Sequence, residues 1–200
     1  MSSGGDIPRR YMDPNLKVWV QQVAQGTMMV SDQKDFVLST ALGSCISACI
    51  RDPLAGIGGM NHFLLPVGKA EQASGGGDGM ALRYGNYAMD LLINEIMKRG
   101  GSKDRLEIKL FGGGNVVKGI SGVGHKNADF IEQYIESEGL KAVSKDLRGF
   151  AARRVQYFPV SGRARMMSIA DNDGETVFMR ELKDRPRVVE SRGGDIELFD

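Results

Sequence analysis

Short stretches of the chain alternate apolar with polar or small residues, which is the pattern of half-buried β-strands. One such stretch, Ile46–Arg51, ends at the proline-containing turn Asp52–Ala55. The next apolar run, Ile57–Leu65, stops at Pro66, so the two runs together predict a β-hairpin. Further strands are predicted at 17–20, 27–30, 36–40, 106–110, 140–143, 154–159 and 164–169.

Two other stretches show the 3.6-residue period of amphipathic helices. The clearer one runs from about Ala81 to Arg99 and is followed by Gly100-Gly101, a typical helix stop. The second begins near Asn127 and ends at Gly139. Many strands and two helices in 200 residues predict one mixed α/β domain.

The ends of the chain and one internal segment lack these periodic patterns. We expect the domain to span residues 17–170, preceded by a loose N-terminal arm, 1–16, and followed by a charged C-terminal tail, 171–200. Within the domain, the glycine-rich segment 68–79 is expected to be a flexible surface loop.

The predicted hairpin places a cysteine next to one of the two histidines of the chain. If residues 52–55 form a four-residue loop, Arg51 faces Gly56 and Cys45 lies directly opposite His62. Facing residues in an antiparallel pair hold their Cβ atoms about 4.5–5.5 Å apart on one side of the sheet. A register slip of one residue, or a bulge at Gly58-Gly59, would change this arrangement.

A thiol beside an imidazole suits nucleophilic catalysis, because imidazole can take the thiol proton near neutral pH. Gly43 and Ser44 precede Cys45 at a turn into the strand, where backbone N–H groups could stabilise an oxyanion. The alternative is that Cys45 and His62 are ordinary buried residues, which is what we expect of Cys49.

Two neighbouring hydroxyls, Ser39 and Thr40, are candidate hydrogen-bond partners for the imidazole, although such hydroxyls often bond to local backbone instead. The glycine-rich segment that begins at Gly112-Gly113 lacks the spacing of a nucleotide-binding loop, so backbone packing or a wall of the active-site cleft is expected there. We expect Phe111 and Asn61 to line the same substrate cleft.

The two cysteines are poorly placed for a disulfide or a shared metal ion. On a strand, Cys45 and Cys49 would lie about 13 Å apart. A helix would bring them together and make a Cys/Cys/His zinc site conceivable, but the β-like alternation argues against it. We therefore expect neither a metal nor a cofactor.

Composition excludes several classes of partner. The 26 basic and 25 acidic residues balance, so there is no electrostatic case for binding nucleic acid or an anionic membrane. The longest uncharged run, Phe36–Ile50, is shorter than the ~20 residues of a spanning helix, so no membrane insertion is expected. The N-terminus shows no apolar signal core, and we expect a cytoplasmic protein.

Several of these motifs resemble those of the chemoreceptor glutamine deamidase (CheD) family of bacterial chemotaxis. The most specific are Thr40-Ala41-Leu42-Gly43-Ser44-Cys45 and Gly58-Gly59-Met60-Asn61-His62-Phe63-Leu64-Leu65-Pro66. The resemblance covers roughly residues 17 to 170 and includes Arg51-Asp52, Arg83-Tyr84-Gly85, Lys109-Leu110-Phe111-Gly112-Gly113-Gly114, Asn127 with Phe130, and Phe158-Pro159-Val160-Ser161-Gly162.

The resemblance implies a layered α-β-β sandwich with mixed, largely antiparallel sheets and two main helices, akin to deamidating bacterial toxins. It also implies hydrolysis of glutamine side chains to glutamate on methyl-accepting chemotaxis receptors by a Cys–His–hydroxyl triad. Here these residues would be Cys45, His62 and either Ser39 or Thr40, since the family threonine six positions before the cysteine corresponds to Ser39. The expected partners are the cytoplasmic domain of those receptors and a response-regulator phosphatase of the CheC type.

Two other functions are compatible with the sequence. A non-catalytic adaptor could use the same cleft to bind a receptor or a phosphatase. A protease or acyltransferase could use the same thiol and imidazole, because peptide bonds and side-chain amides require the same chemistry.

Overall fold

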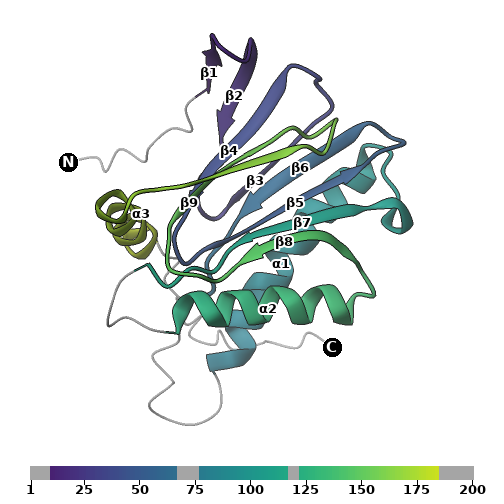
Figure 1. The fold of residues 1–200 in the computed structure, drawn as a ribbon. Helices are drawn as coiled ribbons and strands as arrows, with labels where there is room; N and C mark the ends of the chain where they lie inside the picture. Colours follow the sequence, from purple (N-terminus) through teal and green to yellow (C-terminus); the bar gives the residue numbers. More distant parts are fainter. Residues whose placement is uncertain (1–9, 67–76, 117–121, 185–200) are drawn as a thin grey trace, which may run out of the picture.

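A computed structural model describes residues 10–66, 77–116 and 122–184, and their strands form two five-stranded sheets (Figure 1). The first sheet has the order β1 (Arg10–Asp13), β2 (Val18–Gln22), β4 (Phe36–Leu42), β9 (Arg153–Tyr157), β10 (Ala164–Ser168). The second has the order β3 (Thr27–Ser31), β6 (Ile57–His62), β5 (Ile46–Asp52), β7 (Glu107–Gly112), β8 (Ala142–Leu147). Neighbouring strands are antiparallel except for β2–β4 and β7–β8.

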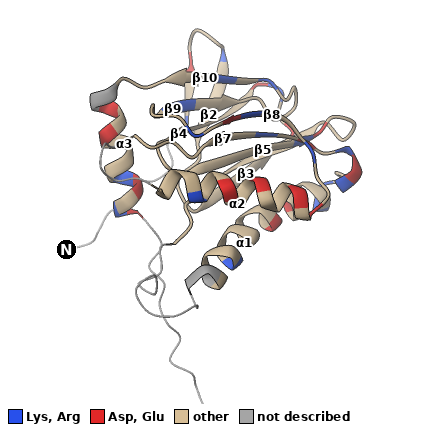
Figure 2. Cartoon of the chain, turned by 60° about the horizontal axis from the view of Figure 1, so that its bottom comes forward, with Lys and Arg blue, Asp and Glu red and all other residues tan. Residues whose placement is uncertain are grey.

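The helices of the described residues cover one of the two sheets. Helices α1 (Gly77–Lys98) and α2 (Val123–Ser137) lie against the second sheet, and acidic residues recur along α2 (Figure 2). A short 3-10 helix, η2 (Lys103–Arg105), precedes β7, and helix α3 (Asp171–Lys183) lies at one end of the sandwich beside β4. The order helices, second sheet, first sheet confirms the predicted layered α-β-β sandwich.

The alternation of β5 explains the two main cores. Ile46, Ala48 and Ile50 point toward α1 and α2 and are fully buried in the helix–sheet core. Cys45 and Cys49 lie in the other core, between the two sheets. Both faces of β5 are therefore buried, which makes it a central strand of the fold.

The β5–β6 hairpin forms as predicted, but its register is shifted by two residues. The ladder pairs Asp52 with Ile57 and Cys49 with Met60, and a further bridge joins Ile46 to Phe63. Cys45 is therefore not directly opposite His62, as the four-residue loop 52–55 had predicted. Both side chains still lie on the same face, because a shift of two residues preserves the alternation of a strand.

The side chain of Asp52 explains the shifted register. Its Oδ1 accepts hydrogen bonds from the N–H groups of Leu54 (2.9 Å) and Ala55 (3.1 Å), so Asp52 ends the strand instead of entering the loop. Gly56 closes the turn with φ +66°, donating its N–H to the carbonyl of Asp52 at 3.0 Å. The turn is thus 53–56.

The predicted strands and both predicted helices are present, and three elements were missed. β1 lies in the predicted N-terminal arm, η2 precedes β7, and α3 forms in the stretch expected to be a tail without periodic structure. The buried stripe of α3 consists of Gly174, Phe178 and Glu181, so a glycine and a carboxylate hide its helical period. Most of the predicted loop 68–79 lies outside the described residues, and the division into arm, domain and tail stays a prediction. No helix of the described part has the length and apolar content to cross a bilayer.

Replacing Asp52 by asparagine should destabilise the fold. Burial raises the pKa of Asp52, but hydrogen bonds from Arg105 and from the N–H groups of Ala55, Ser102 and Leu54 outweigh it and hold the pKa far below its usual range. The neutral amide loses these charge-assisted bonds, so the free energy of unfolding should fall by about 1.5–3 kcal/mol in urea titrations at pH 7. The exposed control Asp104→Asn should change it little, and equal stability of the two variants would contradict this account.

Candidate active site

The loop Gly43–Cys45 carries the chain from β4 in the first sheet to β5 in the second. Each of its three carbonyls accepts a hydrogen bond from behind the loop. The N–H of Gly114 donates to the Gly43 carbonyl (2.8 Å), Nδ2 of Asn127 to Ser44 (2.9 Å), and the N–H of Gly113 to Cys45 (2.8 Å). These bonds leave the three loop N–H groups on the other side, where the sheets do not use them.

The glycine-rich end of β7 permits this close approach. Gly112 has φ +114°, and a Cβ at this position would overlap the carbonyl oxygen of Cys45. The predicted role of Gly112 and Gly113 as backbone packing or cleft wall thus corresponds to a support beneath the loop.

The imidazole of His62 is 5% exposed and is held by a hydroxyl from the other sheet. Thr40 Oγ1 lies 2.8 Å from His62 Nδ1 and 3.0 Å from the carbonyl oxygen of Val23. Because that carbonyl can only accept, the hydroxyl proton goes to Val23, and the hydroxyl oxygen accepts the Nδ1 proton of the imidazole. The neutral ring therefore carries its proton on Nδ1 and has its lone pair on Nε2.

The thiol of Cys45 lies beside this imidazole. Cys45 is fully buried, and its sulfur is 3.4 Å from Oε1 of Gln25. The Cys45 sulfur, a His62 ring nitrogen and a carboxylate oxygen of Glu181 all lie within 4.8 Å of one another. The shifted hairpin register thus makes Cys45 and His62 diagonal neighbours that still meet on one face.

Burial sets the protonation states of the site at neutral pH. It lowers the pKa of His62 to about 4, and the backbone hydrogen bond to Val23 opposes this only in part, so the imidazole is neutral and able to accept a proton. Burial raises the pKa of Cys49 far above its usual range, which leaves this second thiol protonated and unreactive.

A carboxylate from α3 occupies the N–H side of the loop. Glu181 Oε1 accepts from the N–H of Gly43 (2.7 Å) and of Cys45 (3.3 Å), and Oε2 accepts from the N–H (2.7 Å) and Oγ (2.9 Å) of Ser44. Burial raises the pKa of Glu181, and the hydrogen bonds from the loop lower it in part. The three N–H groups and the Ser44 hydroxyl, together called the loop cradle below, thus bind a planar carboxylate.

Cys45, His62 and Glu181 have the ligand types of a zinc site, but the hydrogen bonds of Glu181 argue against a metal ion there. Both oxygens of Glu181 already accept hydrogen bonds from the loop cradle. A cation bridging Cys45, His62 and Glu181 would have to compete with those bonds. The geometry therefore fits an anion-binding loop better than a metal centre.

The two candidate hydroxyls, Ser39 and Thr40, face different sides of their sheet. The predicted cleft residues Asn61 and Phe111 also lie in different parts of the fold. Thr40 contacts the imidazole, whereas Ser39 is the preceding residue of β4 and so faces the other side of its sheet. Asn61 also faces away from His62: its Oδ1 accepts from the Ala48 N–H (2.8 Å) and its Nδ2 donates to the Ala88 carbonyl of α1 (3.1 Å). Phe111 packs between the sheets in the same core as Cys45.

Three residues at the site escaped the sequence analysis: Gln25, Asn127 and Glu181. Asn127 was predicted only as a helix start and as part of the family motif, although a polar residue on the buried side of a helix signals a specific hydrogen bond. Gln25 and Glu181 come from a connecting loop and a charged segment, and neither gives a local signal in the sequence.

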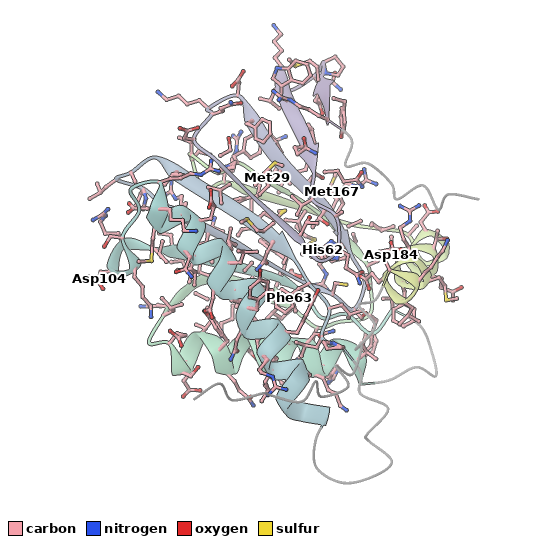
Figure 3. The ribbon with its side chains drawn as sticks, turned by 180° about the vertical axis from the view of Figure 1, so that it is seen from behind. Met29, His62, Phe63, Asp104, Met167 and Asp184 are labelled. Atoms are coloured by element: carbon pink, nitrogen blue, oxygen red, sulfur yellow. The ribbon has the colours of Figure 1, made fainter. Side chains whose placement is uncertain are left out.

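A cavity of about 110 Å³ adjoins the imidazole, between α3 and the first sheet. It is lined by His62 and Thr40 on one side and by Val177, Arg180 and Glu181 of α3 on the other. Figure 3 shows His62 directed toward the end of the sandwich where α3, ending next to Asp184, lies. Helix α3 is therefore the outer wall of the site.

The site combines a buried thiol, a neighbouring imidazole with a free lone pair, an orienting hydroxyl and a set of converging N–H groups. These are the components of a thiol-dependent acyl-transfer site. The family described as CheD chemotactic sensory transduction matches residues 64–168 of this chain. The chain belongs to the CheD family.

Several relatives are similar over nearly the whole chain. A protein from Rhodopseudomonas palustris is 46% identical over 97% of this chain and 91% of its own length, and one from Caulobacter vibrioides is 46% identical over 94% and 96%. A third, from Halorhodospira halophila, is 43% identical over 95% and 89%. Each is named "Probable chemoreceptor glutamine deamidase CheD".

The lowered pKa of His62 predicts a pH-dependent stability. Between pH 4 and pH 6.5 the unfolded chain binds a proton at this residue that the folded chain does not, so the free energy of unfolding rises with pH. From pH 7 to pH 5 His62 should account for a loss of about 2 kcal/mol. Urea titrations should show this loss in wild type and a correspondingly smaller one in His62→Gln.

The other histidine provides the control. His125 has an exposed side chain, so His125→Gln should retain the wild-type difference between pH 7 and pH 5. An undiminished difference in His62→Gln would show that the buried imidazole is not its source.

Proposed function

We propose that this chain hydrolyses the side-chain carboxamide of particular glutamines on methyl-accepting chemotaxis receptors, giving glutamate and ammonia. The names of its relatives supply the substrate class. The observation that carries the proposal is that the Cys45 sulfur and the imidazole lie beside a loop that binds a glutamate carboxylate, which is the product of this reaction.

In the first step Nε2 of His62 takes the thiol proton of Cys45, and the thiolate attacks the carboxamide carbon of the glutamine. The carboxamide oxygen becomes an oxyanion. The N–H groups of the loop cradle stabilise it, and they need no reorganisation because their carbonyls are already bound to Gly113, Gly114 and Asn127.

The tetrahedral intermediate then collapses. The protonated imidazole gives its proton to the departing nitrogen, ammonia leaves, and a thioester to Cys45 remains. In the second half of the reaction His62 takes a proton from water, whose oxygen attacks the thioester. Breaking the C–S bond releases the glutamate side chain, and the imidazole returns the proton to the thiolate.

Thr40 has a positioning role in this scheme. Its hydroxyl fixes the Nδ1–H tautomer of His62 and so keeps the lone pair of Nε2 directed to the thiol. When the ring becomes an imidazolium, the same hydrogen bond acquires a charged donor and becomes stronger.

The proposed reaction takes place in the cytoplasm, where the modified parts of the receptors lie. A response-regulator phosphatase of the CheC type stays a predicted partner. No contact of the described residues bears on that partnership.

The decisive experiment is mass spectrometry of a cytoplasmic receptor fragment incubated with the protein. Exchange of –NH₂ for –OH adds about 1 Da at each target glutamine. The gain should appear with wild type and be lost with Cys45→Ala and with His62→Ala, while Cys49→Ala serves as the matched thiol control and should retain it. Deamidation by Cys45→Ala would rule out Cys45 as the nucleophile, and receptor binding without any mass gain in wild type would rule out the enzyme in favour of an adaptor.

Thr40→Val should slow deamidation about 10- to 100-fold, the cost of one hydrogen bond to a charged group in the transition state. The loss should appear in kcat, and Thr40→Ser should restore most of it because the hydroxyl returns. Ser39→Ala, one residue away, should behave as wild type. If Ser39→Ala were the impaired variant, the assignment of the orienting hydroxyl to Thr40 would be wrong.

A further inference from the structure

Glu181 is an unusual residue to find buried at the centre of a proposed active site. It is 3% exposed, and among the described residues its only ion-pair neighbour is His62, at 4.0 Å between Nε2 and Oε1. No lysine or arginine of the described part compensates its charge. The loop cradle stabilises the charge through four hydrogen bonds of 2.7–3.3 Å, and a hydrogen bond from the Cys45 side chain adds to them.

The loop cradle does not depend on Glu181 for its shape. Its carbonyls are bound by Gly113, Gly114 and Asn127, which belong to other parts of the fold. Gly43 also lacks a Cβ, which at this position would lie 2.9 Å from Oε2 of Glu181. The loop cradle can therefore bind a planar carboxylate or carboxamide at close range, whether this chain or a substrate protein supplies it.

Besides the Glu181 side chain, two described contacts attach helix α3 to the sandwich. Phe178 is its buried apolar anchor, and the main chain of Glu181 accepts a hydrogen bond from Nε2 of Gln25 at 3.2 Å. The helix follows β10 after only Ile169 and Ala170. These two residues are where the backbone would turn if α3 moved away from the site while both sheets stayed intact.

Glu181 and a substrate glutamine cannot occupy the loop cradle together. The carboxylate lies where the oxyanion of the proposed reaction would form, and the helix that carries it walls the cavity next to His62. A glutamate side chain on a protein is also the product of that reaction. Glu181, bound in the loop cradle, therefore has the same side chain as a glutamate product that has not dissociated.

We propose that the loop cradle is a subsite for a glutamine or glutamate side chain, and that α3 closes it as a product mimic built into the chain. Substrate binds only to molecules in which α3 has moved away, so the apparent affinity falls in proportion to the open fraction. This inference rests on the proposed function for the identity of the natural ligand. The closure itself is testable without any substrate.

The test measures alkylation of Cys45 by iodoacetamide, followed on the Cys45 peptide by mass spectrometry. With α3 closed in more than about nine molecules in ten, Glu181→Ala should be labelled at least about tenfold faster than wild type. Glu175→Ala removes an exposed carboxylate from the same helix and should be labelled at the wild-type rate. Equal rates for wild type and Glu181→Ala would overturn the proposal.

Acetate separates loss of the carboxylate from general loosening of the fold. It replaces the atoms removed in Glu181→Ala, so acetate should slow the labelling of that variant and leave wild type and Glu175→Ala unchanged. Faster labelling of Glu181→Ala that acetate does not reduce would contradict a carboxylate subsite. Glu181→Gln keeps the side-chain size but turns an NH₂ group toward the N–H donors, and it should be labelled at an intermediate rate.

Kinetics with the receptor fragment distinguish this proposal from the proposed function. Glu181→Ala should lower KM and leave kcat unchanged, because it removes a competitor and no group of the reaction. If Glu181→Ala is labelled faster than wild type but neither of the two proteins deamidates the fragment, the proposed function fails and the closure by α3 stands. If wild type and Glu181→Ala deamidate with the same KM and are labelled at the same rate, the closure fails and the proposed function stands.

Discussion

The site depends on one set of hydrogen bonds, those that hold the carbonyls of Gly43, Ser44 and Cys45 from behind. The loop passes from one sheet to the other, so neither ladder uses its backbone groups. Gly113, Gly114 and Asn127 bind the three carbonyls, and the three N–H groups are thereby fixed on the opposite side. Burying a loop with unpaired backbone groups would cost free energy. In this loop the three N–H groups instead pair with a bound negatively charged group.

The layered architecture brings together groups that no single element could supply. His62 belongs to the second sheet, Cys45 to the loop that leads into it, Thr40 to the first sheet, and Glu181 to a helix at the end of the sandwich. The hydrogen bond between Thr40 and His62 therefore joins the two sheets and sets the ring tautomer at the same time. Glu181 is stable there only because the loop donors replace the water that its carboxylate loses on burial.

The local pattern of the sequence predicted most strands and two helices close to their observed bounds. The pattern did not predict α3, because the buried residues of this helix are Gly174, Phe178 and Glu181. Only one of these three is a large apolar residue, so the helical period of apolar residues is absent. It also misjudged the hairpin register, because the hydrogen bonds from Leu54 and Ala55 to the Asp52 side chain move the turn by one residue. Cys45 and His62 nevertheless lie close together, since a shift of two residues keeps each side chain on its own face.

By itself, the sequence determined that a thiol and an imidazole lie on one face of a hairpin, after a glycine-serine turn, in a mixed α/β domain. Alternation and turn chemistry are local properties, and they are sufficient for that conclusion. Only the tertiary structure showed that Thr40 and not Ser39 contacts the imidazole, because these adjacent and chemically alike residues face opposite sides of β4. Only it brought Glu181 to Gly43, 138 positions away in the chain, because the packing of α3 against the sandwich decides which groups distant in sequence meet.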